Sequence, residues 1–127
     1  MLPKWGHTLF TCLLLTVNPD GTLANKQRYD WLYTPDNKDD AGADGLKVDS
    51  AGRVYVATRL GIQVADQAGR VNIIFPIPNG QPANLCFGGN NFDIMYVACR
   101  DKIYRRKFKT RGVNTFEGPT KPKKPNL

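Results

Sequence analysis

The sequence predicts an all-β protein built from a repeated unit of short antiparallel strands. Two apolar segments with almost the same sequence, Val-Tyr-Val-Ala at residues 54–57 and Met-Tyr-Val-Ala at residues 95–98, begin 41 positions apart. That offset lies within the ~40–45 residues of a four-stranded propeller blade. The chain has 12 Gly among 127 residues, and no segment keeps a helical apolar period for three turns. A single repeat cannot bury its own apolar face, so several blades packed side by side are expected.

The first apolar segment, residues 9–17, predicts strand structure that ends at a turn. The next four residues, 18–21, read Asn-Pro-Asp-Gly, in which proline and glycine suit successive turn positions. The run is too short to cross a membrane as a helix, so no membrane segment is expected. Because Lys4 precedes the run, a secretory signal stays open as its alternative role.

Short strands separated by tight turns are predicted along the rest of the chain. Residues 22–33 predict an outer strand with Tyr29, Trp31 and Tyr33 alternating on one face, and the polar residues 35–43 predict a loop. The further expected strands are residues 46–48, 53–58, 61–65, 71–77, 85–87, 94–99, 102–104 and 107–109. Four successive strands of this kind make one blade.

The cysteine pattern excludes a structural zinc site and favours a reducing environment. The chain has 3 Cys and 1 His, and no two cysteines form a Cys-x-x-Cys pair, so such a site has no ligand set. Cys86 and Cys99 fall within expected strands and are interpreted as core residues. Thiols without framework spacing favour a cytoplasmic location.

Positive charge is confined to the end of the chain. The net charge is +7, yet residues 1–99 carry 8 Lys or Arg and 9 Asp, whereas residues 100–127 carry 10 Lys or Arg and 2 acidic residues. Residues 100–111 interleave basic side chains with Tyr104 and Phe108, a pattern that also binds single-stranded nucleic acid. We interpret the segment as a solvated outer strand and expect no nucleic-acid partner. A weak polyanion-binding module through residues 100–111 is the alternative.

An ordered set of five motifs connects the chain to a known family. The motifs are Asp-Gly-Leu-Lys-Val at 44–48, Gly-Arg-Val-Tyr-Val-Ala at 52–57, Gly-Ile-Gln-Val at 61–64, Asn-Leu-Cys-Phe-Gly-Gly at 84–89 and Met-Tyr-Val-Ala-Cys at 95–99. In order and spacing they resemble the last third of the six-bladed propellers of the SMP-30/gluconolactonase/luciferin-regenerating family. The likeness covers residues 18–116 and implies a partial six-bladed β-propeller of about two to three blades. Residues 1–17 are then an uncertain N-terminal strand segment, and residues 117–127 a basic tail rich in Pro and Lys.

The resemblance implies the hydrolysis of a sugar lactone by metal-activated water. Family members hold one divalent metal, often calcium or zinc, with a glutamate, an asparagine and the aspartate of the Asp-Gly motif. That aspartate corresponds to Asp44, which the resemblance makes both a metal ligand and the catalytic residue that activates water. Asn84 opens the equivalent strand of the next repeat and is expected to contact the small-molecule lactone substrate. Asp49 begins the sequence Asp-Ser-Ala-Gly and is interpreted as a turn residue instead.

The other functional residues of the family have no counterpart in the sequence. Glu117 is the only glutamate, and it lies in a late, turn-rich segment. The chain therefore reads as a truncated gluconolactonase-like fragment, and whether it is an enzyme on its own is left open. The alternative is a non-catalytic propeller remnant that associates with itself through exposed strand edges.

Overall fold

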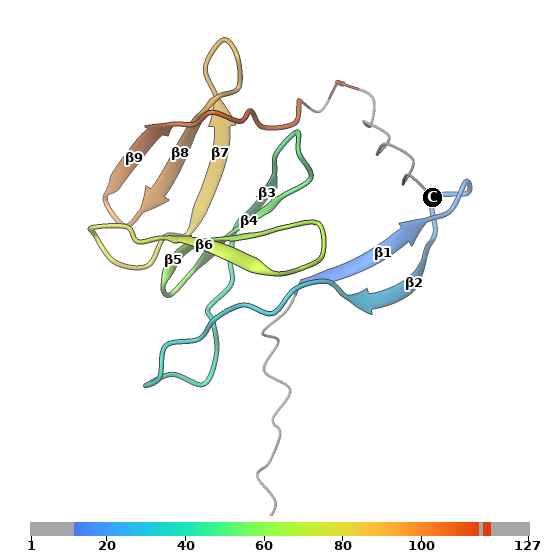
Figure 1. Cartoon of the computed structure of the whole chain (residues 1–127), viewed down its shortest axis with the longest axis horizontal. Helices are drawn as coiled ribbons and strands as arrows, with labels where there is room; N and C mark the ends of the chain where they lie inside the picture. The colour runs from blue at the N-terminus through green and yellow to red at the C-terminus, as the bar shows by residue number, and fades with distance from the viewer. Residues whose placement is uncertain (1–11, 115, 118–127) are drawn as a thin grey trace, which may run out of the picture.

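Nine strands in three antiparallel sheets make up the part of the chain that this computed structural model describes, residues 12–114 and 116–117 (Figure 1). The first sheet pairs β1 with β2, the second has the order β3-β4-β5-β6, and the third has the order β7-β8-β9. The bounds are β1 Leu13–Val17, β2 Leu23–Arg28, β3 Leu46–Val48, β4 Val54–Thr58, β5 Gly61–Ala65, β6 Val71–Phe75, β7 Asn84–Gly88, β8 Ile94–Cys99 and β9 Lys102–Lys107. Within the described residues there is no helix, and hence none long and apolar enough to span a membrane.

The second sheet is a complete four-stranded blade whose central strands, β4 and β5, are buried on both faces. Tyr55 of β4 pairs with Val64 of β5, and the next pair along the ladder is Val56 with Gln63. All four side chains are buried. Because successive residues of a strand point to opposite faces, β4 and β5 supply side chains to two separate packing layers.

The main core lies between the second and third sheets. Its buried members are Tyr55, Ala57, Ile62 and Val64 of the second sheet and Leu85, Met95 and Val97 of the third. Aromatic rings cross this interface edge to face, with centroid distances of 5.2 Å for Tyr55–Phe87 and 5.4 Å for Phe75–Phe108. These are favoured geometries for aromatic pairs. The sheets thus pack against each other through side chains, as adjacent blades do.

A smaller core covers the opposite face of the second sheet. Val56 packs there with Leu32 and Ala41, both from the long connection between β2 and β3. The buried Gln63 holds the same connection, because its Nε2 donates to Tyr33 O at 2.7 Å and its Oε1 accepts from Tyr33 N at 2.8 Å. Both polar ends of the buried amide are therefore satisfied.

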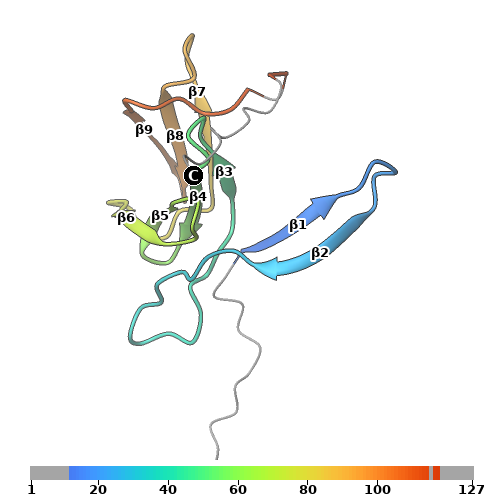
Figure 2. The ribbon, with the colours of Figure 1, turned by 45° about the vertical axis from the view of Figure 1, so that its right-hand side comes forward.

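The hairpin of β1 and β2 extends away from the two blades, as Figures 1 and 2 both show. Its junction with the second sheet is tightly built. The Tyr29 hydroxyl donates to Asp66 O at 2.8 Å, and the buried Asp30 accepts from Cys12 N at 2.6 Å. Gly69, in the turn between β5 and β6, lies directly against the Tyr29 carbonyl.

Two turns of the second sheet share the sequence pattern Asp-x-Ala-Gly-Arg. In each, Oδ1 of Asp49 or Asp66 accepts from backbone N–H groups two and four residues later, and Oδ2 accepts from the arginine Nε, at 2.7 Å from Arg53 and 2.9 Å from Arg70. Asp49 is the buried copy and also accepts from the Tyr55 hydroxyl at 2.9 Å. The pKa of Tyr55 is raised, mainly by burial and to a smaller extent by this hydrogen bond. The prediction that Asp49 initiates a turn is confirmed.

The expected outer strand at residues 22–33 is wrong beyond Arg28, where β2 ends. Asp30 is fully buried, which a regular solvent-facing strand does not allow. Tyr29, Trp31 and Tyr33 therefore do not share a strand face. Tyr29 is partly buried against the second sheet, whereas the other two rings are exposed.

Two expectations for the third sheet are also wrong. No separate strand forms at residues 107–109, because β9 continues to Lys107 and Phe108 N then donates to Asp93 O at 2.7 Å. Cys99 is buried as expected, but Cys86 is exposed. Cys86 alternates with the buried Leu85 along β7 and so lies on the face turned away from the main core.

Candidate functional site

Asp44 and Asn84 lie at the entrances to the first strands of the second and third sheets. Asp44 is two residues before β3, and Asn84 is the first residue of β7. The two entrances are bonded together, since Gly45 N donates to Ala83 O at 2.9 Å. The structure therefore brings together the two site residues that the sequence predicts.

Gly45 makes this close approach between the blades possible. A Cβ at this position would overlap Asn84 Oδ1 and lie 2.7 Å from Asn84 Cα. The backbone around Gly45 is fixed on its other side by β4, because Asp44 N donates to Ala57 O and Ala57 N donates to Gly45 O, both at 2.9 Å. The Asp-Gly sequence thus combines a carboxylate with a backbone that can pass close to the next blade.

Arg59 connects the loops that lead into the two strands. Its Nε and Nη2 donate to the Asp40 carboxylate at 3.1 and 3.2 Å, and its Nη1 donates to Gln81 Oε1 at 3.2 Å. Gln81 Nε2 donates in turn to Gly42 O at 3.2 Å. The hydrogen bonds from Arg59 lower the pKa of Asp40. Because Asp40 and Gly42 precede β3 and Gln81 precedes β7, this network helps to position the site.

A cavity of about 330 Å³ adjoins Asn84, on the face of the third sheet turned away from the main core. It is lined by Lys47, Asn84, Leu85, Cys86, Tyr96, Ala98 and Ile103. This volume is at the small end of the range for ligand pockets, ~300–1,000 Å³. Asn84 Oδ1 accepts from Leu85 N at 2.8 Å, which leaves the Nδ2 donor without a partner among the described residues.

Asp44 supplies the negative charge of the site but does not line this cavity. Its carboxylate is exposed and has no hydrogen bond or ion pair within the described part of the chain. Lys47 lines the cavity, and its exposed Nζ donates to Leu46 O at 3.0 Å. The sequence pattern does not mark Lys47 or Tyr96 as site residues. In the structure Tyr96 pairs with Cys86 across the ladder, on the same face as Asn84.

Asp44 and Asn84 fit part of a metal-ligand set but not a complete one. Among residues 12–114, 116 and 117, no group of three or more His, Cys, Asp or Glu side chains is placed to hold a metal ion. Calcium takes ~6–8 oxygen ligands and zinc about four ligands, more than this pair supplies. Glu117 does not extend the set, because both its oxygens accept from Arg111, at 2.8 and 2.9 Å.

The chain is similar to known proteins in both sequence and fold. A family model described as the SMP-30/Gluconolactonase/LRE-like region matches residues 13–100. The X-ray structure of a candidate gluconolactonase superposes with a TM-score of 0.71 at 22% sequence identity, covering 83% of this chain and 34% of its own. A luciferin-regenerating enzyme superposes with a TM-score of 0.66 at 20% identity, covering 82% and 40%. No curated protein sequence matches. The chain therefore has a propeller-type fold and spans about a third to two fifths of the length of these structures.

Proposed function

The chain belongs to the SMP-30/gluconolactonase/LRE-like family, and on that premise we propose that Asp44 and Asn84 form part of a site that hydrolyses a sugar lactone. The observation that carries the proposal is the backbone bond from Gly45 to Ala83, which holds the two residues at neighbouring strand entrances. Asp44 supplies an exposed carboxylate as an acid–base group, and Asn84 supplies an amide with an unused hydrogen-bond donor.

In this proposal Asp44 is the base. Its carboxylate accepts a proton from a water molecule while the water oxygen bonds to the lactone carbonyl carbon. Asn84 Nδ2 donates to the carbonyl oxygen, which gains negative charge in the transition state. The bond between the carbonyl carbon and the ring oxygen then breaks. The proton held by Asp44 passes to that ring oxygen, and the product is the open hydroxy acid.

We propose that the cavity beside Asn84 holds the body of the substrate, while the lactone carbonyl stays at the Asn84 end, on the side of Asp44. Its volume of about 330 Å³ suits a small sugar lactone. Lys47, on its wall, attracts the carboxylate that ring opening produces. We propose the roles of Asn84 and Lys47 together, because β7 contributes the amide of Asn84 and the adjacent β3 contributes the ammonium group of Lys47.

The proposal includes a divalent cation, calcium or zinc. Its other ligands would come from outside the described residues. When bound, such an ion polarises a carbonyl and lowers the pKa of bound water. Asp44 is the residue of this chain that would hold it. Neither proton transfer by Asp44 nor hydrogen-bond donation by Asn84 requires the ion.

Asp44→Asn is expected to lower kcat/KM for glucono-1,5-lactone by about a hundredfold, because the amide cannot accept the proton. Hydrolysis by the purified chain is measured above the rate in buffer, with and without calcium or zinc. Asp39→Asn is the matched control, since Asp39 is also exposed and lies in the preceding loop, and it should leave the rate unchanged. Equal rates for the unchanged protein and Asp44→Asn, or no hydrolysis by folded protein with either metal, would overturn the proposal.

A second candidate function is self-association without catalysis. It is favoured by apolar side chains that are exposed on the first hairpin and on β9, among them Val17 at 69%, Leu23 at 63% and Ile103 at 74%. Exposed strand edges and apolar surface promote pairing between chains. A folded, inactive chain whose sedimentation coefficient rises with concentration would favour this function over hydrolysis.

A further inference from the structure

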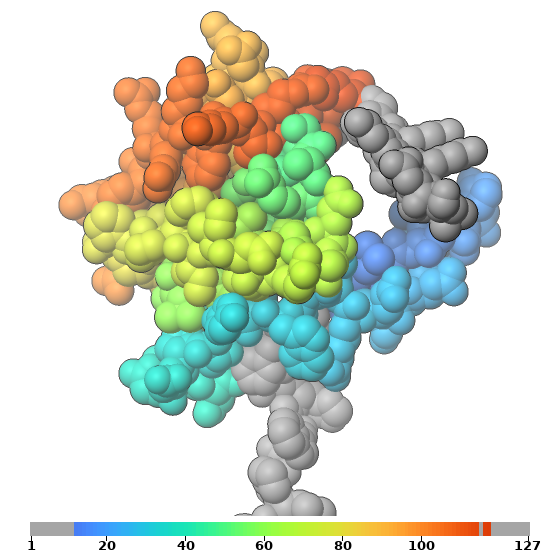
Figure 3. Space-filling view, in the orientation of Figure 1, coloured from blue at the N-terminus to red at the C-terminus, as the bar shows by residue number. Residues whose placement is uncertain are grey.

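A groove with a cationic rim and an apolar floor runs between the outer parts of the second and third sheets. It has a volume of about 340 Å³, and no carboxylate is among the described residues that line it. The rim carries Arg53, Arg106, Lys107 and Lys109, and the floor includes Ile73, Phe75 and Phe108. Figure 3 shows the surfaces of its two sides, β6 in yellow-green and β9 with the segment after it in orange, next to each other on one face.

Arg53 is oriented into this region by a buried partner. Its Nε donates to Asp49 Oδ2 at 2.7 Å, and the Asp49 side chain is fully buried. The two Nη groups of Arg53 have no partner among the described residues. A guanidinium held in this way presents two parallel N–H donors to an oxyanion without a large loss of side-chain entropy.

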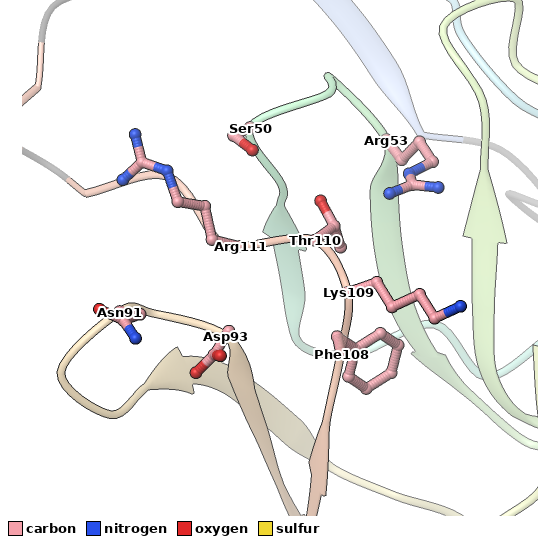
Figure 4. Close-up of a pocket in the computed structure, with 8 residues that line it drawn as sticks. All are labelled: Ser50, Arg53, Asn91, Asp93, Phe108, Lys109, Thr110 and Arg111. Atoms are coloured by element: carbon pink, nitrogen blue, oxygen red, sulfur yellow. The ribbon is translucent and has the colours of Figure 1, made fainter.

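Arg106 and Lys109 provide the remaining unpaired charge. Arg106 stacks on the floor, with its guanidinium carbon 5.3 Å from the Phe75 centroid and 6.0 Å from that of Phe108, and has no ion pair within the described residues. Lys109 is exposed and likewise unpaired there. Figure 4 shows Arg53 and Lys109 on one side of the segment 108–111, and Arg111 on the other.

The floor and its supporting segment are fixed by backbone bonds to both sheets. Phe108 N donates to Asp93 O at 2.7 Å, and Ser50 N donates to Arg111 O at 2.8 Å. Ile73, which is also part of the floor, is 44% exposed, so apolar surface is available between the charges. A neighbouring cavity of about 490 Å³, drawn in Figure 4, shares Arg53, Phe108, Lys109 and Thr110 with the groove. It also contains Asp93, whose carboxylate pairs with Lys107 of the groove at 3.4 Å.

We propose that this groove binds a small organic anion, an oxyanion group attached to a flat apolar body. The unpaired guanidinium and ammonium donors take the oxyanion, and the Phe75–Phe108 floor takes the apolar body. The groove shares no lining residue with the cavity beside Asn84, and neither Asp44 nor Asn84 lines it. The proposal is therefore independent of lactone hydrolysis.

The test is a calorimetric titration with 1-naphthyl phosphate. Arg106→Gln and Lys109→Gln should each weaken binding about tenfold, the effect of losing one charged hydrogen bond at a surface site. Arg105→Gln is the matched control, because it removes the same charge from the preceding residue of β9, which pairs with Tyr96 on the other face of the sheet. It should change the Kd less than about twofold. Asp44→Asn should leave binding unchanged, which separates this site from the lactone site.

Two further ligands separate the parts of the proposed chemistry. Inorganic phosphate and 1-naphthol should each bind at least about tenfold more weakly than 1-naphthyl phosphate, because each lacks one half of the ligand. Equal weakening by Arg105→Gln and Arg106→Gln would overturn the proposal, as would the absence of binding to the folded, unchanged protein. Tight binding of a single-stranded oligonucleotide that depends equally on Arg105 and Arg106 would also overturn it, in favour of a diffuse polyanion surface.

Discussion

Replacing Asp49 with alanine is expected to lower the free energy of unfolding by about 2–4 kcal/mol, because several hydrogen-bond donors lose their buried acceptor. Asp49 is 1% exposed and accepts from two backbone N–H groups, from Arg53 and from the Tyr55 hydroxyl. Alanine leaves these donors without an acceptor, and the Tyr55 hydroxyl is then buried and unsatisfied next to the main core. Urea unfolding followed by tryptophan fluorescence measures the loss.

Asp66→Ala is the control for the Asp49 prediction. Asp66 has the same turn pattern and the same types of backbone and arginine donor, but it lies near the surface. Its donors can bond to water after the change, so the loss of stability should be clearly smaller. Equal losses in the two variants would show that burial of the Asp49 network has no special cost.

Gly69→Ala is expected to destabilise the chain by about 2–4 kcal/mol, from left-handed backbone strain together with a steric overlap. Gly69 has φ +78°, and a Cβ there would overlap Tyr29 O and lie 2.8 Å from the Tyr29 carbonyl carbon. The overlap pushes apart the turn after β5 and the segment that leads out of β2. Backbone amide chemical shifts of residues 13–28 should therefore change together with the unfolding midpoint.

Gly21→Ala separates the two causes of that loss. Gly21 has φ +82°, nearly the same conformation, but a Cβ there meets nothing within 4 Å. It should cost only the conformational strain, about 1 kcal/mol. If Gly21→Ala and Gly69→Ala destabilise equally, the close approach at Tyr29 contributes nothing.

Most strands of the two blades could be predicted from the sequence, because each is a short apolar run between Asp- or Gly-containing turns. β5 has the predicted bounds, and β8 does also. The end of β2 could not be predicted, because it depends on the burial of Asp30 against Cys12, a contact between distant residues. The exposure of Cys86 likewise depends on which face of β7 meets the second sheet.

For the candidate site, the sequence supplied the residues and the structure supplied their surroundings. The repeat places Asp44 and Asn84 at equivalent strand entrances, and the bond from Gly45 to Ala83 joins those entrances. The hydrogen bond from Arg59 to Gln81 joins two different loops, and Lys47 lines the cavity together with residues of other strands. Contacts between distant residues of this kind cannot be predicted from a local sequence pattern. For the groove that contains Phe75 and Phe108, the basic and aromatic character of residues 100–111 is visible in the sequence. The contribution of Arg53, from another blade, could be found only from the structure.

The most direct test of whether Asp44 and Asn84 act as one site is a double-mutant cycle. The quantity measured is kcat/KM for glucono-1,5-lactone, in the unchanged chain, Asp44→Asn, Asn84→Ala and the double variant, under the metal condition that gives the highest rate. We expect the loss in the double variant to be at least about fivefold smaller than the product of the two single losses, since residues that share one substrate are energetically coupled. Single losses that simply multiply would mean that the two residues act independently, and would contradict a shared site.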